Sequence, residues 1–536
     1  MKKLHTLVIG SGAAGLCAAV RLHERAGNIL EIYTEGLHMG TSINTGSDKQ
    51  TYYKLGMYGT EPDSPVLMAR DLAAGGSVHG DIALVEAAMS VPAFSHLTSI
   101  GVPFPHDEFG QYIGYKTDHD PRRRATSTGP YTSRAMCESL IGEINRRKIP
   151  VSKQKIAVKL LTDHSRCVGA EFVDRVTGEF EAVTAANVVF AVGGPGGLYE
   201  TSVYPKVHTG AVGLALEAGA QARNLAESQF GLASIKFRWN VSGSFMQVLP
   251  RFVSTDAAGG DEREFLRPYF ETPEAMYDAI FLKGYQWPFA AAHVPGSSLI
   301  DIFTYIECVE RGRRVWLDFR TDPADFPWER LGAETRDYLT RSGAEGGTPL
   351  ERLARLNAPA VELYRKHGIR LDAEPLEIAV CAQHNNGGLA GTIHWESVNL
   401  RGLFPVGEVN GSHGVTRPGG SALNAGQVGA IRAAECIARR PPMPPFPAAD
   451  FDRIAADAMA ELAQQSERPA ASDWRAERRE FRHRMSACGA FVRSQEAVER
   501  ALAEAAEQRA RLAADGLGDL SPRDRVEALR NRQLCS

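Results

Sequence analysis

The sequence lacks the features of membrane, iron–sulfur and nucleic-acid-binding proteins. Its 536 residues contain no apolar run of about 18 residues or more, so we expect no membrane span. The eight cysteines are dispersed, and even the closest pair, Cys137 and Cys167, does not have C-x-x-C, ferredoxin or zinc-finger spacing. We therefore expect no metal site, and the dispersed thiols favour a reducing, cytoplasmic location. With 60 Lys and Arg against 64 Asp and Glu, the net charge of −4 gives no electrostatic case for nucleic-acid binding.

The amino-terminal residues predict the start of a folded domain. Met-Lys-Lys before an apolar run imitates a signal peptide, but the run is rich in glycine and no convincing cleavage site follows it. Residues 4–9 and 29–35 have the pattern of buried strands and residues 13–25 have helical spacing, which together predict a βαβ unit. Residues 81–100 predict an amphipathic helix, and the proline-rich residues 441–447 predict a break before a helical tail.

The strongest local motif is G-S-G-A-A-G at residues 10–15, between the first strand and the helix. Gly10 permits a tight turn, Gly12 lets backbone N–H groups approach a pyrophosphate, and Gly15 lets the helix pack close to the strand. Glu35 ends the second strand, where a carboxylate can accept hydrogen bonds from ribose hydroxyl groups. We interpret the motif as a dinucleotide site; a glycine-rich turn without a ligand, or a register with Thr34 facing the ribose, are the alternatives.

A second motif, GLFPVGEVNGSHGVTRPGGSALNAG at residues 402–426, resembles a known family. The flavoproteins of the succinate dehydrogenase/fumarate reductase family, which includes L-aspartate oxidase, end their FAD domain with a pattern like G-L-[YF]-A-x-G-E-x-x-G-x-H-G-x-N-R-x-G-G-N-S-L. A helix start near Ser421 can point its N–H groups at the flavin C2 carbonyl. The matching residues are Gly402, Leu403, Gly407, Glu408, Gly411, His413, Gly414, Arg417, Gly419, Gly420 and Leu423.

The resemblance implies FAD as the cofactor. Residues 39–47 resemble the family's loop beside the isoalloxazine ring, and H-T-G at 208–210 resembles its T-G-D-G element without the acidic residue. The family often links the flavin covalently through the His of an S-H-T step, whereas residues 41–43 here are T-S-I, so we expect non-covalent FAD. The expected cofactor-binding residues are Gly10, Gly12, Ala14, Gly15, Glu35, Ser42, Gly46, Ser47, Gly194, Glu408, Ser421 and Leu423.

Departures from the family pattern concern the catalytic residues. The Q-F-H-P-T step, whose His contacts the dicarboxylate, reads Q-F-G-L-A at 229–233. The D-V-V-S-R step, whose Arg donates a proton, aligns with D-I-F-T-Y at 301–305 and puts Tyr305 in that place. In the H-x-T-M-G-G step, His384 is displaced by one position or Gln383 takes the role. We therefore do not expect a true fumarate reductase.

Four residues remain as catalytic candidates. The guanidinium of Arg417 offers a planar fork for a substrate carboxylate, unless it pairs with the protein's own acidic groups. His384 can move a proton near neutral pH, or can be a satisfied buried histidine. His413 is expected to contact substrate or flavin, or to shape its loop. Tyr305 is the weakest candidate, because it can belong to the core of an apolar helix.

Two further stretches have alternative interpretations. The basic triplet at residues 122–124 can line an entrance for anions, but a solvated loop is the better expectation. The aromatic stretch at residues 283–289, K-G-Y-Q-W-P-F, can close over the flavin ring and exclude water, or can be ordinary core.

These observations and the resemblance give one overall interpretation. The fold is α/β: a Rossmann-like FAD-binding domain of the glutathione-reductase type at 1–235 and 376–440, an inserted α+β cap domain at 236–375, and a helical domain at 449–536. The chain is expected to transfer a hydride between a small, carboxylate-bearing substrate and flavin N5. The alternatives are a non-catalytic flavin-binding protein and an electron-transfer flavoprotein subunit. The expected partners are a small anionic substrate and either an electron-transfer partner or a second copy of the chain.

Overall fold

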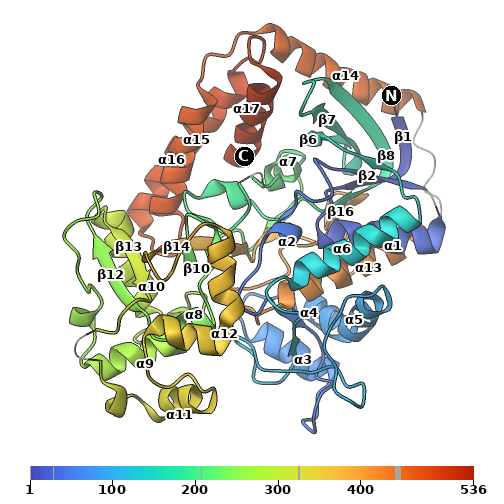
Figure 1. Cartoon of the computed structure of the whole chain (residues 1–536). Coiled ribbons are helices and arrows are strands. Elements are labelled where there is room, and N and C mark those ends of the chain that lie inside the picture. The colour runs from blue at the N-terminus through green and yellow to red at the C-terminus, as the bar shows by residue number, and fades with distance from the viewer. Residues whose placement is uncertain (1, 28, 207, 324–325, 441–447) are drawn as a thin grey trace.

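Two sheets and a carboxy-terminal group of helices make up a mixed α/β structure (Figure 1). The computed structural model describes residues 2–27, 29–206, 208–323, 326–440 and 448–536. The proline-rich break expected at 441–447 lies outside the described residues. None of the helices in these ranges is both long and apolar enough to cross a bilayer.

The first sheet contains the βαβ unit that the sequence predicts. Strands β2, β1 and β8 are parallel neighbours, β16 pairs with β8 in parallel, and β6 and β7 extend the sheet in antiparallel fashion. Both faces are buried: Val8 of β1 faces one hydrophobic core, while Leu7 and Ile9 face another. The strands are β1 (Lys2–Ile9), β2 (Leu30–Tyr33), β5 (Val151–Ser152), β6 (Lys155–Asp163), β7 (Arg166–Asp174), β8 (Phe180–Phe190) and β16 (Leu403–Pro405).

Helices from distant parts of the chain cover one face of the first sheet. α1 (Ala13–Ala26), α6 (Thr132–Arg146) and α13 (Ser421–Arg439) share a core with it. The single helix expected over 81–100 is two helices, α4 (Gly80–Ala88) and α5 (Ser90–Ser99). Proline at position 92 has no N–H to donate to the carbonyl four residues earlier, so the chain ends one helix and begins another.

The second sheet is antiparallel, in the order β11-β10-β14-β13-β12. The sheet's first strand in the sequence, 228–234, and its last, 376–385, pair with each other. Both lie outside residues 236–375, the range expected for an inserted domain. The strands are β10 (Ser228–Ser234), β11 (Trp239–Asn240), β12 (Arg251–Thr255), β13 (Arg314–Asp318) and β14 (Leu376–Asn385). The helices between them are α8 (Ser244–Gln247), α9 (Pro273–Lys283), α10 (Leu299–Tyr305), α11 (Ala333–Arg341) and α12 (Pro349–Lys366).

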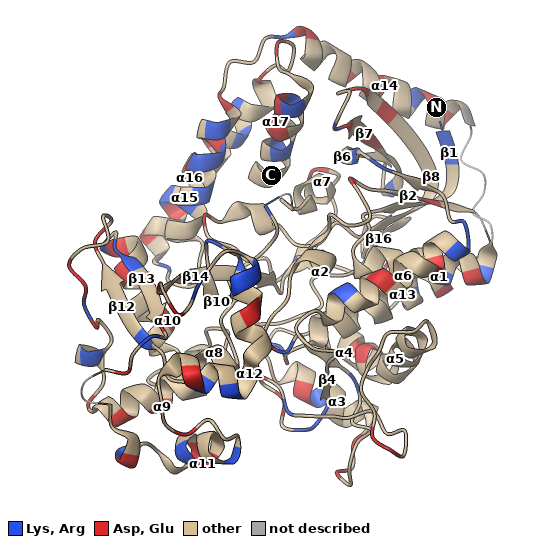
Figure 2. Ribbon diagram, viewed as in Figure 1, with Lys and Arg blue, Asp and Glu red and all other residues tan. Residues whose placement is uncertain are grey.

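The tail is helical, as the sequence predicts, and its last helix packs back on the first sheet and α7. Acidic and basic residues are interspersed along these helices (Figure 2). They are α14 (Ala448–Glu467), α15 (Trp474–Cys488), α16 (Gln495–Ala514) and α17 (Pro522–Cys535). The remaining elements are α2 (Thr41–Asn44), β3 (Tyr52–Tyr53), α3 (Pro65–Ala73), β4 (Ala125–Thr126), α7 (Val212–Glu217), β9 (Ala222–Arg223) and β15 (Gly388–Leu389).

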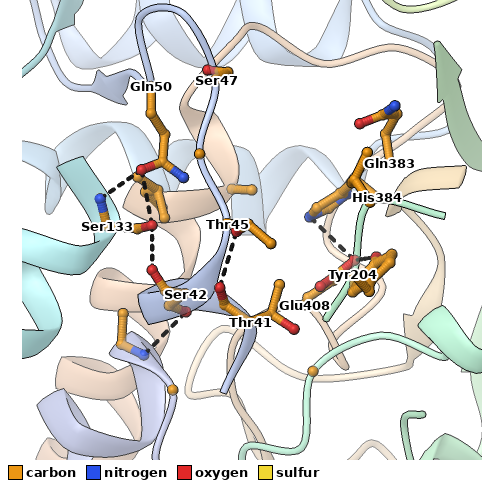
Figure 3. A pocket seen from close by; sticks show the side chains of 18 of the residues that line it. Thr41, Ser42, Thr45, Ser47, Gln50, Ser133, Tyr204, Gln383, His384 and Glu408 are labelled. Carbon is orange, nitrogen blue, oxygen red and sulfur yellow. Dashed lines mark hydrogen bonds and ion pairs between the residues drawn. The ribbon is translucent and has the colours of Figure 1, made fainter. Parts of the chain in front are cut away.

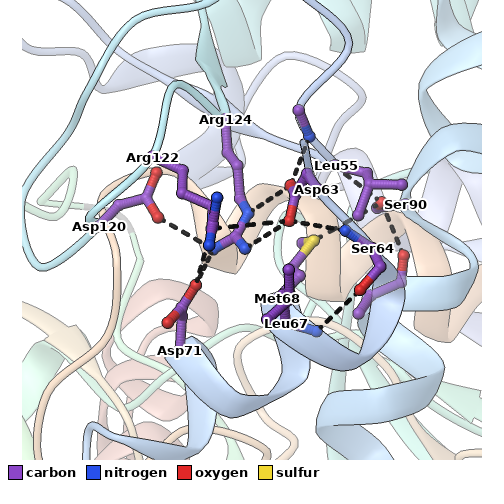
Figure 4. Close-up of polar contacts among 12 residues, drawn as sticks. Leu55, Asp63, Ser64, Leu67, Met68, Asp71, Ser90, Asp120, Arg122 and Arg124 are labelled. Carbon is purple, nitrogen blue, oxygen red and sulfur yellow. Dashed lines mark hydrogen bonds and ion pairs between the residues drawn. The ribbon is translucent and has the colours of Figure 1, made fainter. Parts of the chain in front are cut away.

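The last residue of the basic triplet is not in a solvated loop. Arg124 is completely buried, and its guanidinium donates to both carboxylate oxygens of Asp63 at 2.8 Å (Figure 4). It also donates to Asp71 at 2.6 Å and to Asp120 at 3.1 Å. Arg124 therefore joins α3 and the residues before it to the loop 115–124.

Loss of this guanidinium is expected to destabilise the fold. In Arg124→Met the side-chain volume is similar, but several carboxylates lose their buried partner, at a cost of about 3–5 kcal/mol. The midpoint of urea unfolding should fall accordingly. Arg123→Met, at an exposed neighbour, is the matched control and should leave the midpoint within experimental error. Equal midpoints for the two variants would contradict the structural role of Arg124.

Candidate functional site

One large cavity, of about 960 Å³, runs along the carboxyl ends of β1 and β2 and reaches the second sheet. It is lined by the loop after β1, the loop around α2, the start of α13, and residues of β10, β14 and α17. This position, outside the carboxyl ends of parallel strands, is where open α/β sheets bind ligands. The volume suits an extended ligand with a small molecule beside it.

The glycine motif forms the floor of the cavity. Gly10 has a φ of +102°, and a Cβ there would lie 2.3 Å from the carbonyl oxygen of Ala191. A Cβ on Gly15 would lie 2.3 Å from the carbonyl oxygen of Gly10, so the helix and the turn need both glycines. α1 has neither a capping side chain at Gly12 nor an acidic residue in its first turn. Its amino end therefore faces the cavity with positive potential and no anion of its own.

Glu35 and Thr34 both line the far end of the cavity. The hydroxyl of Thr34 is hydrogen-bonded to Ser11 at 2.7 Å and is nearly inaccessible to solvent. One carboxylate oxygen of Glu35 accepts a hydrogen bond from Arg530 at 2.5 Å, and the other lies 3.7 Å from Arg175. Glu35 is the more accessible of the two, and its contact with ribose hydroxyls stays a prediction.

The loop around α2 forms a wall of the cavity (Figure 3). The hydroxyl of Ser42 accepts a hydrogen bond from the backbone of Ala13 at 3.3 Å, which ties this loop to α1. The side chain of Gln50 accepts hydrogen bonds from the backbone and the hydroxyl of Ser133 at 2.8 and 2.9 Å. A Cβ on Gly46 would lie 2.3 Å from the carbonyl oxygen of Pro130, so the loop packs tightly behind the cavity wall.

The second motif supplies the opposite wall. Gly407 and Gly420 have φ values of +82° and +85°, and Gly420 caps α13 without a capping side chain. Glu408 accepts hydrogen bonds from the hydroxyl of Tyr204 and, at 2.9 Å, from the backbone of Asn385. Both hydrogen bonds reach the same carboxylate oxygen, Oε1, and fix the orientation of Glu408 in the cavity wall (Figure 3).

Most of the expected cofactor-binding residues lie on this one surface. The residues that line the cavity are Gly10, Gly12, Ala14, Glu35, Ser42, Gly46, Ser47, Glu408 and Leu423. Three others lie behind it. Gly15 packs under the turn, a Cβ on Gly194 would lie 2.7 Å from Glu408, and Ser421 is the first residue of α13.

Arg417 lies in the cavity wall as an unpaired cation. Its contact is a long one, 3.4 Å from Nη1 to the carbonyl oxygen of Pro418, and its buried Nε has no hydrogen-bond acceptor in the described structure. Burial lowers the pKa of Arg417 to about 10, so the guanidinium remains charged at neutral pH. The carboxylates of Glu408 and Asp118 act on this cation only from beyond ion-pair distance, and an anionic ligand would supply the direct partner that it lacks in the described residues.

The two histidine candidates lie beside Arg417 but are uncharged. Nδ1 of His384 is 3.0 Å from the side-chain oxygen of Asn386, and its ring centroid is 5.6 Å from that of His413. Burial and then Arg417 hold the pKa of His384 well below its usual value, and burial lowers the pKa of His413 to about 3. His384 lines the cavity, whereas His413 lies behind it. Of the two interpretations that the sequence leaves open for His384, these surroundings favour a buried neutral histidine over one that exchanges a proton near neutral pH.

Tyr305 is not part of the cavity wall. It ends α10, it is 7% exposed, and its ring packs against Phe491 with 5.3 Å between centroids. The structure thus corrects the expectation of a catalytic role and favours the alternative, a core residue. Where the sequence departs from the family's motif, alignment gives Tyr305 a position in the chain but does not show which way its side chain faces.

Asp118, which was not among the residues predicted from the sequence, lines the same cavity as Arg417. Burial raises the pKa of its carboxyl to about 7, while the cations of Lys283 and Arg417 oppose the rise. Lys283 is completely buried in an ion pair with Asp301 at 2.5 Å. The signal in the sequence that could have identified Asp118 is the run of titratable residues D-H-D at 118–120. It lies just before the basic triplet at residues 122–124.

Trp287 occupies the space that a side chain at residue 231 would need. A Cβ on Gly231 would lie 3.0 Å from the ring of Trp287, and this ring lines the cavity with a buried Nε1 that has no acceptor in the described structure. Gln383 lies nearby and donates to the carbonyl oxygen of Gly231 at 3.1 Å. Position 231, where the family pattern has a histidine, thus carries a glycine, and the aromatic side chain of Trp287 packs against it.

Comparisons with known proteins give a family model that names a cofactor and several related oxidoreductases. A family model described as an FAD binding domain matches residues 5–259. The chain is 25% identical to a fumarate reductase (CoM/CoB) subunit of Methanothermobacter marburgensis over 435 residues, which is 80% of this chain and 71% of that protein. It is 27% identical to the L-aspartate oxidase of Agrobacterium fabrum over 451 residues, 81% of this chain and 74% of that protein.

The fold is similar to solved structures over its whole length. The FrdA chain of E. coli quinol fumarate reductase has a TM-score of 0.75 and 19% identity, with 100% of this chain and 87% of that chain covered. A chain of the Sdh1 complex of Mycobacterium smegmatis has a TM-score of 0.74 and 19% identity, with 100% and 85% covered. The uncapped amino ends of α1 and α13 and the glycine floor between them fit the pyrophosphate and the ring of FAD.

Gly12→Ala tests this fit without disturbing the protein's own packing. Gly12 has φ −69° and ψ 173°, which alanine adopts freely, and its Cβ would lie 3.5 Å from the hydroxyl of Ser42. The added methyl group would instead occupy the space of the pyrophosphate, so the Kd for FAD should rise at least about tenfold. FAD fluorescence quenching measures the Kd.

Gly142→Ala, in α6 with open space around its Cβ, is the control and should bind FAD as the unchanged protein does. Unchanged FAD affinity in Gly12→Ala would mean that the pyrophosphate does not lie over α1.

Proposed function

We propose that the chain, which is similar to a fumarate reductase subunit and to L-aspartate oxidases, is a member of the succinate dehydrogenase/fumarate reductase flavoprotein family and transfers a hydride between a small carboxylate-bearing substrate and N5 of FAD. It is an FAD-dependent oxidoreductase. Bound FAD supplies the two-electron chemistry, and the residues of the chain bind the substrate, orient it and hold its proton.

The single observation that carries the proposal is the guanidinium of Arg417 in the cavity wall, which is half-buried, has no ion pair within 4 Å in the described residues and keeps a buried Nε without an acceptor. A carboxylate can accept two parallel hydrogen bonds from it and neutralise its charge in a site of low polarity. Such a contact fixes one end of a small substrate, which is the condition for a short, aligned approach to the acceptor atom.

Asp118 is the group that we expect to hold the substrate's proton. Its carboxyl faces the same cavity as Arg417, and its pKa of about 7 allows it to accept or release a proton at neutral pH. His384 can orient the substrate by hydrogen bonding: its neutral ring donates from Nδ1 to Asn386, so the buried Nε2, which has no hydrogen-bond partner in the described residues, can accept a hydrogen bond from a substrate donor. In this proposal Asp118, rather than His384, is the general acid or base.

The second sheet and its helices act as a cap over the substrate end in this proposal. Trp287 and Tyr285 bring aromatic surface to the cavity, and closure of this surface would exclude water from the reacting atoms. Because Trp287 fills the space above Gly231, the end of the substrate away from Arg417 meets an aromatic wall rather than a histidine. This arrangement argues against fumarate as the substrate.

We expect FAD to be held without a covalent bond. The residues at 41–43 of α2 are threonine, serine and isoleucine, none of which offers an imidazole. Acid precipitation of the holoenzyme should therefore release FAD into the supernatant, whereas yellow precipitate would contradict this expectation.

A second candidate function is electron transfer within a larger complex. It is favoured by the similarity to a protein named as one subunit of a fumarate reductase. In that case the reduced holoenzyme would pass electrons to a partner that copurifies with it. A holoenzyme that turns over alone with a small-molecule acceptor would exclude this alternative.

The test of the first proposal is anaerobic mixing of the FAD-loaded protein with a panel of small carboxylates and amino acids. A substrate should bleach the flavin absorbance, and Arg417→Gln should lower kcat/KM for it at least about a hundredfold, because a buried charge-assisted contact is lost. Arg341→Gln, on the exposed face of α11, is the control. Equal bleaching by Arg417→Gln and the unchanged protein would overturn the role of Arg417.

The charge of Asp118 should also give ligand binding a pH dependence. Below about pH 7 its carboxyl is neutral and Arg417 attracts an anion, whereas above about pH 7 the carboxylate repels the anion and competes for Arg417, since the pKa of Asp118 is about 7. The Kd for malonate, measured by its perturbation of the flavin spectrum, should therefore rise as the pH is raised through this value. Asp118→Asn should remove this rise, while Asp337→Asn on α11 should retain it. A slope that persists in Asp118→Asn would assign the titration to another group.

A further inference from the structure

The last helix of the chain reaches the dinucleotide end of the cavity. Arg530 and Gln533 of α17 line this end, together with Glu35 at the end of β2 and Ala157 of β6. Arg530 and Gln533 are both largely buried. A tail helix that brings buried polar side chains into the cofactor cavity does more than cover the sheet.

The contact between Arg530 and Glu35 joins residues 495 positions apart in the sequence. Nη2 of Arg530 donates to Oε1 of Glu35 at 2.5 Å, and Nη1 donates to Glu527 of the same helix at 2.9 Å. The guanidinium thus has a carboxylate on each side, and its orientation is fixed before any ligand binds. It holds the carboxylate of Glu35 at the cavity wall, where the ribose of FAD is expected.

Three further contacts hold α17 against the first sheet and α7. The side-chain amide of Gln533 donates to the carbonyl oxygen of Ala157 at 2.9 Å. A Cβ on Gly213 of α7 would lie 1.9 Å from the carbonyl oxygen of Gln533, so the two backbones approach as closely as glycine allows. Arg525 donates to the carbonyl oxygen of Gly178 at 3.3 Å. The position of Arg530 is therefore determined by packing along the whole helix.

We propose that α17 is part of the FAD site: Arg530 positions Glu35 for the ribose and contacts the adenosine half of the cofactor. The proposal rests on the binding of FAD in this cavity and adds a structural consequence. Cofactor binding and the docking of the last helix stabilise each other, because a ligand that binds only the docked form shifts the equilibrium toward it.

The experiment compares FAD with FMN, which lacks the adenosine half. In Arg530→Met the Kd for FAD should rise about tenfold, while the Kd for FMN should stay unchanged, because only FAD reaches Glu35 and α17. Arg523→Met, at an exposed arginine in the first turn of the same helix, is the matched control and should bind both flavins normally. Fluorescence titration of the full-length apoprotein measures all values.

The outcomes separate this proposal from the binding of FAD itself. Unchanged FAD affinity in Arg530→Met, or an equal loss for FAD and FMN, would overturn the role of Arg530 while leaving FAD as the cofactor. Failure of the unchanged protein to bind FAD would overturn both. In a second measurement, hydrogen exchange of the unchanged protein should slow in α17 but not in α16 when FAD is added; equal exchange in α17 with and without FAD would also count against the proposal.

Discussion

A half-buried cation without a direct ion pair, Arg417, is the constraint around which the substrate end of the cavity is organised. Desolvating a guanidinium costs several kcal/mol unless acceptors replace the lost water. Glu408, a candidate acceptor in the same motif, is already engaged by Tyr204 and the backbone of Asn385. The charge of Arg417 is therefore left for something that enters the cavity, and this charge adds to burial in lowering the pKa of His384 beside it.

The charge of Arg417 is balanced across the cavity rather than through a direct ion pair. Asp118 faces it, and the buried pair of Lys283 and Asp301 adds no net charge when both groups are ionised. The loop that carries Asp118 is held two residues later, where Asp120 meets the buried guanidinium of Arg124. The ion-pair network of Arg124 thus helps to set the position of the Asp118 carboxyl in the cavity. A rigid network of this kind holds Asp118 and Arg417 at a fixed separation.

Local motifs could be predicted from the sequence because their geometry is local. The glycines at 10, 12 and 15 lie in one turn, and the steric demands at Gly10 and Gly15 arise from backbone within the same unit or the adjacent strand. Arg417 could be predicted because it belongs to a long motif that keeps its register. Glu35 could be predicted from its place at the end of β2, although its partner Arg530 could not.

What the sequence could not predict depends on contacts between distant segments. Trp287 meets Gly231 only because the segment 283–289 packs against a strand of the second sheet. The absence of the family's histidine at position 231 and the aromatic side chain at position 287 therefore look unrelated along the chain. Tyr305 aligned with a catalytic position, yet the rotation of α10 directs its ring to Phe491 of the tail. A pKa is equally non-local: His384 would titrate near neutral pH in water, and only its burial and Arg417 make it neutral.

The tail extends this argument from the substrate end to the cofactor end. Both ends of the cavity are completed by residues far in sequence from the glycine motif: Arg417 and Asp118 at one end, and Arg530, the partner of Glu35, at the other. A site assembled in this way forms only when the first sheet, the second sheet and α17 have all docked. If FAD binds as proposed, it contacts all three of these parts, and a ligand that binds only their docked arrangement stabilises it. The cofactor would then be a structural component as well as a reactant.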